Sequence, residues 1–326
     1  MNKIKTKKYN YLELLYILLL LTIILLVVIF PSNSIGSFYN GISIWATKVL
    51  PSLLPFFILT KLLSYTNFIP YISKKITPLT RKLYNVDGYG GYIYIMSIIS
   101  GYPTGAKITS ELYKDGRITK GQAYTITAFT STSGPLFILG TVGIALFHNI
   151  RLGIIVLLSH YIGALLNGLL YRCKESNKNT LTQTHISHTE NIILSSVNSS
   201  INAILNIGVL IALFYMITDL IITLNLFTPI VELLKIIGVD KNISISILSG
   251  ILEITTGEIM LSSLALPQNL SIIISTALVS FGGLSIHAQA YSYLQDFDMP
   301  YRKFLLQKIT HCILATLVSF LLLCIV

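Results

Sequence analysis

Two polar segments interrupt long hydrophobic stretches of this chain and combine residue types that bind small solutes inside membranes. The first is Ser100–Lys107, with the sequence SGYPTGAK, and the second is Glu253–Glu258, with the sequence EITTGE. Lipid offers the backbone no hydrogen-bond partners, so an interrupted helix is tolerated within a membrane only where protein buries it or where it lines a cavity. Interruptions at corresponding positions of two halves of a membrane protein indicate a substrate site.

The first segment supplies exposed backbone groups and hydroxyls. Gly101 and Gly105 permit close approach of the backbone, and Pro103 prevents a continuous helix. Half-helices that end at such a break present N–H groups or carbonyl oxygens that carry partial charge. Ser100 and Thr104 add hydroxyls that would give specificity. The alternative is a kinked but inert helix, because glycine and proline are common in transmembrane helices.

Charged residues accompany both interruptions. Lys107 follows the first, whereas Glu253 and Glu258 bracket the second. A charge at the centre of a bilayer costs about 2.5 kcal/mol or more, so such residues are usually paired or functional. If the two segments meet, we expect Lys107 to pair with Glu258 or Glu253. That pair would be either a static salt bridge or part of a ligand-binding or proton-coupled site.

Two further segments have the composition of unwound helix and are expected to complete the walls of the same site. Thr130–Pro135 places a run of hydroxyl residues before a Gly-Pro pair, and Gly282–Gln289 combines two glycines with His287 and a glutamine. His287 would bind solute or relay protons, or it is a satisfied packing histidine. The predicted substrate-binding residues are Ser100, Gly101, Pro103, Thr104, Gly105, Lys107, Ser131, Ser133, Gly134, Glu253, Thr256, Gly257, Glu258, Gly283, His287 and Gln289.

The motifs of common enzymes are missing from the sequence. It contains no Gly-x4-Gly-Lys-Ser/Thr loop, no Gly-x-Ser-x-Gly, no His-Glu-x-x-His and no closely spaced pair of cysteines. We therefore expect no enzymatic activity, no catalytic residues, no cofactor and no metal ion. An intramembrane hydrolase built from Glu253 and His287 is an alternative that their spacing does not favour.

Composition places the chain in a membrane. Of its 326 residues 53% are hydrophobic and 11% are charged, and apolar runs of spanning length recur, as at 12–30, 153–170 and 304–326. The net charge of +10 comes from basic residues in short loops beside apolar segments. This pattern is typical of topology signals that face anionic lipid, and it does not predict binding to nucleic acid.

The distribution of loop charge predicts an all-α polytopic protein with about seven spans and two re-entrant hairpins. The lysine-rich N-terminus is assigned to the cytoplasm, 12–30 is read as a retained anchor, and 31–40 is an uncharged outer loop. Basic residues flank the first interrupted segment on both sides, so that segment enters and leaves on the cytoplasmic side. The last run, 304–326, ends outside.

The two halves of the chain match as an internal repeat. Thr104-Gly105 corresponds to Thr256-Gly257, and Ser131–Pro135 corresponds to Ser280–Leu284. Three full spans lie between equivalent points, and an odd number inverts the second half, so the two hairpins would meet near the midplane. Four regions are predicted: an anchor and outer loop (1–40), a first repeat (41–172), a polar cytoplasmic linker (173–190) and a second repeat (191–326).

Three motifs together resemble the YlbJ-type sporulation integral membrane proteins. They are LPSLLPF at Leu50–Phe56, SGYPTGAK at Ser100–Lys107, and SGPLFI at Ser133–Ile138 followed by Gly140. This group carries nucleoside-recognition, or Gate, domains, which nucleoside and ferrous-iron transporters share. The resemblance covers most of the chain, from Trp45 to the last span, although the second half carries a weaker signature.

The resemblance implies a membrane protein of an endospore-forming cell. It implies a role in spore formation, most specifically of the cortex, and a place in the mother-cell or outer forespore membrane. It does not imply that nucleosides are the substrate. A transporter-like protein that binds or moves a small polar solute is the expected function. The alternative is a non-transporting scaffold for cortex-building proteins, and homo-oligomers or other sporulation membrane proteins are the expected partners besides lipid.

Overall fold

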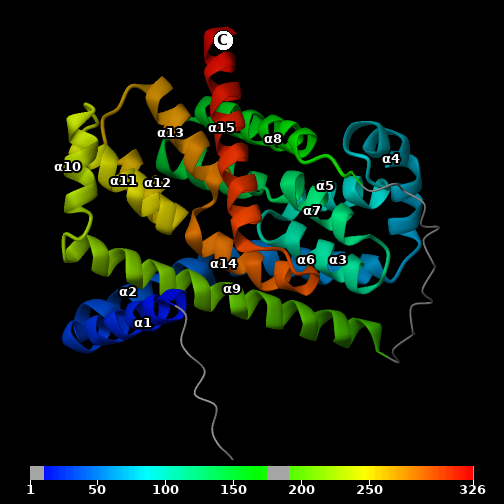
Figure 1. The fold of residues 1–326 in the computed structure, drawn as a ribbon, viewed down its shortest axis with the longest axis horizontal. Helices are drawn as coiled ribbons and strands as arrows, with labels where there is room; N and C mark the ends of the chain where they lie inside the picture. The colour runs from blue at the N-terminus through cyan, green and yellow to red at the C-terminus, as the bar shows by residue number, and fades with distance from the viewer. Residues whose placement is uncertain (1–10, 175–190, 326) are drawn as a thin grey trace, which may run out of the picture.

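The computed structural model describes residues 11–174 and 191–325, and within these ranges it contains helices and no strand (Figure 1). The first part comprises α1 (Tyr11–Ile29), α2 (Pro31–Ile44), the π-helix η1 (Trp45–Val49), α3 (Leu50–Ser64), α4 (Phe68–Tyr84), α5 (Gly88–Ser100), α6 (Thr104–Lys114), α7 (Lys120–Thr130), the π-helix η2 (Leu136–Leu146) and α8 (Ile150–Leu170). The second comprises α9 (Ile192–Thr223), α10 (Thr228–Ile236), α11 (Lys241–Leu252), α12 (Ile254–Ser262), α13 (Gln268–Phe281), α14 (Gly283–Leu294), the 3₁₀-helix η3 (Gln295–Phe297) and α15 (Tyr301–Ile325). The prediction of an all-α membrane protein is confirmed.

The same order of elements occurs twice along the chain. An interrupted hairpin, an interrupted helix and a continuous helix follow one another as α5–α6, α7–η2 and α8, and again as α11–α12, α13–α14 and α15. The two continuous helices pack closely, because a Cβ added at Gly163 of α8 would lie 2.7 Å from the Cα of Ala315 in α15. This order agrees with the predicted repeat.

One element differs from the sequence-based expectation. Residues 31–40, expected to form a loop, belong to α2, and the segments Ile17–Ile29 and Pro31–Thr47 meet at 105°. Pro31 has no N–H to leave unpaired and a backbone angle suited to the first turn, so it starts a helix there. The break predicted at Thr130–Pro135 is found, since α7 ends at Thr130 and η2 begins at Leu136.

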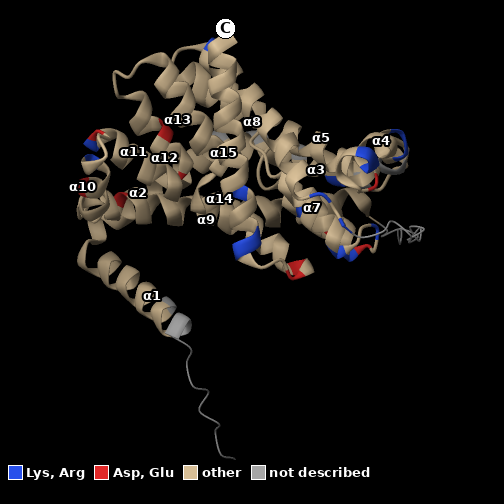
Figure 2. Cartoon of the chain, turned by 45° about the horizontal axis from the view of Figure 1, so that its top comes forward, with Lys and Arg blue, Asp and Glu red and all other residues tan. Residues whose placement is uncertain are grey.

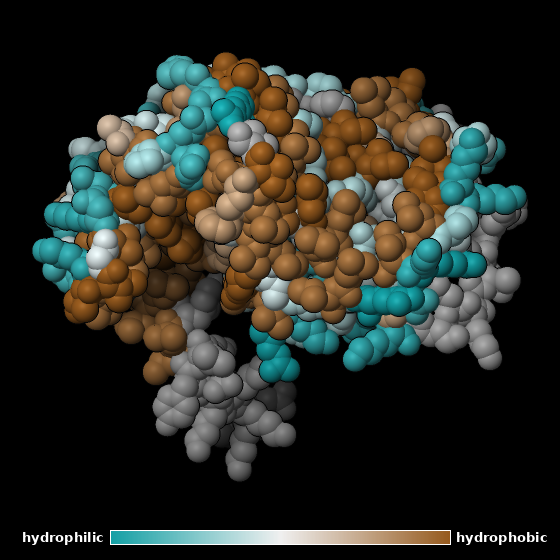
Figure 3. Space-filling model, turned by 90° about the horizontal axis from the view of Figure 1, so that it is seen from above, coloured by the Kyte–Doolittle hydropathy of each residue, from teal (hydrophilic) through white to brown (hydrophobic). Residues whose placement is uncertain are grey.

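Four of the described helices are long and apolar enough to cross a membrane, and a fifth span arises if the bent pair at Pro31 counts as one. They are 150–170, 192–223, 268–297 and 301–325. The predicted count of seven spans therefore stays a prediction. Figure 3 shows hydrophobic side chains over most of the middle of the face seen from above, with hydrophilic side chains gathered at both ends of the long axis, over α10 and α4.

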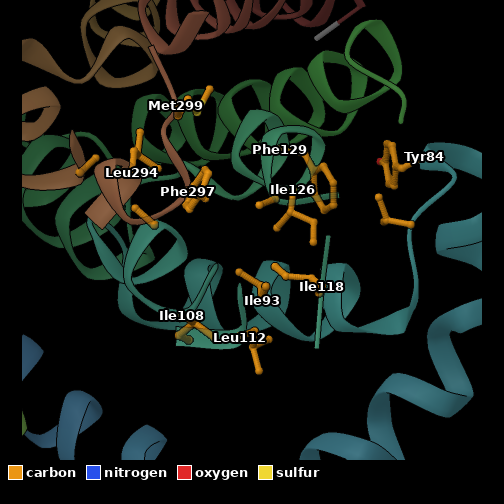
Figure 4. Packing of buried hydrophobic residues seen from close by; sticks show 14 of the residues in the cluster. Tyr84, Ile93, Ile108, Leu112, Ile118, Ile126, Phe129, Leu294, Phe297 and Met299 are labelled. Atoms are coloured by element: carbon orange, nitrogen blue, oxygen red, sulfur yellow. The ribbon is translucent and has the colours of Figure 1, made fainter. Parts of the chain in front are cut away.

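Charge differs between those two ends, as Figure 2 shows. Helix α4 carries Lys74, Lys75, Arg81 and Lys82, whereas α10 carries both Glu232 and Lys235. The membrane orientation predicted from loop charge stays a prediction. A core of buried aromatic and aliphatic side chains lies beside α4 and joins α5–α7 to the segment after α14; it includes Phe129 and Phe297 (Figure 4).

Candidate functional site

A cavity of about 150 Å³ lies where all four interruptions meet. Its polar lining consists of Ser100, Gly101, Tyr102, Ser133, Gly134, Thr141, Glu253, Thr255, Ser285 and Gln289. Its apolar lining includes Ile44, Val49 and Leu53 before and within α3, and Ile207 and Ile211 on α9. The cavity thus has a polar side built by broken helices and an apolar wall built by η1, α3 and α9.

The first two interruptions touch through their glycines. Gly101 has φ +77°, a conformation that L side chains rarely adopt, and a Cβ added there would lie 2.5 Å from the amide nitrogen of Gly134. The break between α5 and α6 is therefore in backbone contact with the break between α7 and η2. Only glycine gives both the dihedral angle and the space at position 101.

Side chains from α8 and α15 satisfy the backbone groups that unwinding frees after α7. The N–H of Ser133 donates to Nε2 of His160 at 2.9 Å, and the carbonyl oxygen of Ser133 accepts from the Tyr161 hydroxyl at 3.1 Å. The carbonyl oxygen of Ser131 accepts from the Lys308 ammonium at 3.2 Å. The buried break therefore meets the requirement that backbone polar groups have partners.

Glu253 forms the turning point of the second hairpin. It follows α11 and caps α12, and its Oε2 accepts hydrogen bonds from the N–H of Thr256 at 2.7 Å and the Thr256 hydroxyl at 2.9 Å. A carboxylate at this position also stabilises α12, because the N-terminus of a helix carries partial positive charge. Its other oxygen takes no hydrogen bond from the described residues, and the side chain lines the cavity.

The break between α13 and α14 touches the second hairpin, α11–α12. The break between α7 and η2 touches the first hairpin, α5–α6, in the same way. Gly283 has φ +68°, and a Cβ there would lie 3.0 Å from the carbonyl oxygen of Gly250. Gly257 also faces Gly250, because a Cβ at position 257 would lie 2.5 Å from its amide nitrogen. Gly257 and Gly283 therefore hold backbones together and lie outside the cavity lining.

The expected ion pair between Lys107 and a glutamate is not found: among the described residues no salt bridge joins Lys107 to Glu253 or Glu258. The Lys107 ammonium lies 4.5 Å from the centre of the Phe57 ring. Glu258 is fully buried and accepts a hydrogen bond from Ser275 at 2.8 Å, while its second oxygen has no partner. The two hairpins line the same cavity with Ser100–Tyr102 and Glu253–Thr255, before the chain reaches Lys107 or Glu258.

Two of the remaining predicted residues contact other groups. His287 bonds through Nε2 to the carbonyl oxygen of Phe281 at 2.9 Å and through Nδ1 to the Tyr301 hydroxyl at 3.2 Å, so both ring nitrogens are occupied by protein. Gln289 lines the cavity and donates to Ser285 at 3.3 Å.

The structure brings part of the predicted set together at the cavity: Ser100, Gly101, Ser133, Gly134, Glu253 and Gln289. The others lie outside its lining: Pro103, Thr104, Gly105, Lys107, Ser131, Thr256, Gly257, Glu258, Gly283 and His287. Sequence reasoning missed Tyr102, Thr255 and Ser285, although all three lie within the predicted segments. It also missed His160 and Lys308, whose partners are distant in the chain.

A curated relative settles the family. The chain is 30% identical over 319 residues to the sporulation integral membrane protein YlbJ of Bacillus subtilis (strain 168), an alignment that covers 90% of this chain and 78% of the relative. The chain belongs to the YlbJ family. Residues 46–151 of this YlbJ-family member match the Gate family, described as nucleoside recognition, as the resemblance predicted. This region contains the first hairpin and the first interrupted helix.

The fold is shared with a transporter. A solved structure of CNTnw in an inward-facing substrate-bound state superposes with a TM-score of 0.53 at 14% identity, over 84% of this chain and 75% of that one. The YlbJ-family chain is thus an integral membrane protein with a transporter-like fold.

Proposed function

We propose that this YlbJ-family protein binds a small polar solute in the cavity between its four interrupted segments and moves it across the membrane. One observation carries the proposal: both hairpins and both broken helices converge on one cavity of about 150 Å³. Broken helices that meet inside a membrane protein place backbone dipoles beside a solute. A scaffold has no need for such a buried polar site.

The lining favours a neutral or cationic solute that donates hydrogen bonds. Glu253 contributes a carboxylate oxygen without a hydrogen bond, and none of the described lining residues is Lys, Arg or His. Ser100, Ser133 and Ser285 offer hydroxyls in the same lining. An anionic group would be repelled there, because a buried charge needs a partner of opposite sign.

Size restricts the solute further. A cavity of roughly 150 Å³ holds a molecule the size of benzene, whereas pockets for larger organic ligands measure about 300–1,000 Å³. The conformation described here therefore accommodates a single-ring solute. A nucleoside would require the apolar wall of η1, α3 and α9 to move away from the broken helices.

Membership of the YlbJ family supports a proposal for the biological setting. We place the protein in the mother-cell or outer forespore membrane and assign it a role in cortex formation. A non-transporting scaffold for cortex-building proteins is the competing function. The scaffold requires an intact surface and tolerates changes inside the cavity, so cavity variants separate the two functions.

The test is uptake of labelled solutes into proteoliposomes. The panel contains a nucleobase, a sugar, a small amine, a nucleoside and, as an anion, a nucleotide. Thr255→Phe fills the cavity and is expected to abolish uptake. Glu253→Gln keeps an acceptor for Thr256 and removes the charge, so uptake of donor-rich solutes should fall about tenfold, as expected for a lost charged hydrogen bond.

The matched control is Glu232→Gln, the same substitution at an exposed position of α10. It is expected to transport like the wild type. Sporulation in cells whose own copy is deleted gives the second readout. If both cavity variants reach normal abundance in the membrane and restore cortex formation fully, the transport proposal is refuted and the scaffold is favoured.

A further inference from the structure

Lys308 is a buried lysine that has no carboxylate partner. Its side chain projects from α15 and is 1% exposed, and no salt bridge to it exists in the described part of the chain. Besides Tyr102, the ionisable side chains that interact electrostatically with it are His160, His287, His311 and Cys312. A cation buried among such groups needs negative charge from another source.

Backbone and hydroxyl oxygens supply partial negative charge instead. The ammonium donates to the Tyr102 hydroxyl at 2.6 Å and to the carbonyl oxygen of Ser131 at 3.2 Å. Tyr102 follows the C-terminal end of α5, and Ser131 is the C-cap of α7. The C-terminal end of a helix carries about half a negative charge, which stabilises a cation nearby.

The same contacts join three interrupted helices. The Tyr102 hydroxyl reaches the carbonyl oxygen of Val279 at 3.4 Å, near the C-terminal end of α13. The Lys308 ammonium therefore links the first hairpin and the first broken helix directly, and the second broken helix through Tyr102. Tyr102 also lines the cavity, so this link fixes one wall of the solute site.

We infer that the Lys308 ammonium is a tethered cation, held by the unwound carbonyl oxygen of Ser131 at the end of α7 and by the Tyr102 hydroxyl in place of a free monovalent ion. In transporters with broken helices, unwound carbonyls and half-helix C-terminal ends coordinate a free coupling cation. Here a side chain supplies the positive charge. The conformation of the breaks is then independent of Na⁺, and no free ion is needed at this position. The inference rests on the site of the proposed function and states that this site needs no free cation here, but its test needs no transport.

The experiment measures thermal unfolding of the purified full chain in detergent. Chloride salts of Na⁺, K⁺, methylammonium and the bulky cation N-methylglucamine are compared at equal ionic strength. The wild type should unfold at the same temperature in all four. Lys308→Ala empties the cation position, so its unfolding temperature should be low in N-methylglucamine and should rise saturably with Na⁺ or methylammonium.

Two variants control for the loss of the side chain alone. Lys308→Met fills the space without a charge and should be destabilised without responding to any cation. Lys303→Ala removes an exposed lysine of the same helix, which lies over the Tyr124 ring, and should behave as the wild type.

Two results would overturn the inference: a wild type that is stabilised by Na⁺ over N-methylglucamine, or a folded Lys308→Ala that responds to no cation. If Lys308→Ala does not fold, Lys308→Gln decides. Its amide can donate to the same two oxygens without a charge, so it should unfold at a lower temperature than the wild type. Unfolding at the wild-type temperature would show that the charge is unnecessary. Because these readouts are stabilities, a failure of solute uptake leaves them interpretable, and their failure leaves the uptake assay unaffected.

Discussion

His160 and Ser133 are joined by a hydrogen bond in which the backbone N–H of Ser133 donates to Nε2 of the imidazole at 2.9 Å. Nε2 must therefore be unprotonated, which places the ring proton on Nδ1, where it faces the Ser280 hydroxyl at 2.9 Å. Ser133 and Ser280 belong to the two interrupted helices α7–η2 and α13–α14. One histidine of α8 thus ties both together, and it is fully buried.

His160→Leu should destabilise the fold by about 1–3 kcal/mol, the cost of leaving a buried N–H unpaired. His160→Gln places an acceptor near the position of Nε2 and should recover part of that loss. Chemical denaturation of the purified protein measures both. Equal losses for Leu and Gln would show that the hydrogen bond to Ser133 contributes little and that ring packing dominates.

Lys107 and Glu258 should contribute to stability independently, because no salt bridge joins them. In a double-mutant cycle of Lys107→Met and Glu258→Gln, the coupling energy should stay within about 0.5 kcal/mol of zero. The charge-swapped pair Lys107→Glu/Glu258→Lys should accordingly be worse than either single change. Rescue of one swap by the other would contradict this arrangement of the hairpins.

Gly101→Ala should lower stability more than Gly116→Ala, although both glycines have positive φ. Nothing lies within 4 Å of a Cβ added at Gly116, so Gly116→Ala should lose only the stability that dihedral strain costs, about 1–2 kcal/mol. At Gly101 the new methyl group would also press on the amide of Gly134, adding about 1–3 kcal/mol. Comparison of the two unfolding midpoints isolates the contact between the breaks, and equal midpoints would argue against it.

The positions of the breaks were predictable from sequence, because glycine and proline act on the backbone locally. The predicted segments at Ser100, Ser131, Glu253 and Gly282 all contain or adjoin helix ends in the structure. Their partners were not predictable in the same way. Ser131 lies 177 residues from Lys308 in the chain, and only the packing of α15 brings them together.

The role of charge was the weakest part of the prediction for a related reason. Lys107 and Glu258 stood out because they adjoin the motifs, but each lies beyond the tip of its hairpin, on the half-helix that leads away from the cavity. Glu253, at the tip itself, does line the cavity. Distance along the helix from the break, rather than charge alone, therefore decides which of these charged residues line the cavity.

Gly208→Ala should disturb the apolar wall of the cavity in a way that Gly36→Ala does not. A Cβ at Gly208 of α9 would lie 2.5 Å from the indole ring of Trp45, whereas nothing lies within 4 Å of one at Gly36 in α2. Both glycines are helical, so both changes bring the same gain of up to about 1 kcal/mol in helix propensity. Only Gly208→Ala opposes it with crowding, which costs about 1–3 kcal/mol.

Trp45 makes this wall observable because it is the single tryptophan of the chain. Its Nε1 donates to the carbonyl oxygen of Ile204 at 3.2 Å, which fixes η1 against α9 beside the lining residue Ile207. Gly208→Ala should push the indole outward, weaken this bond and shift the emission maximum. Gly36→Ala should leave emission unchanged and stability equal or higher. An unchanged spectrum in Gly208→Ala would contradict the contact between Gly208 and the Trp45 ring.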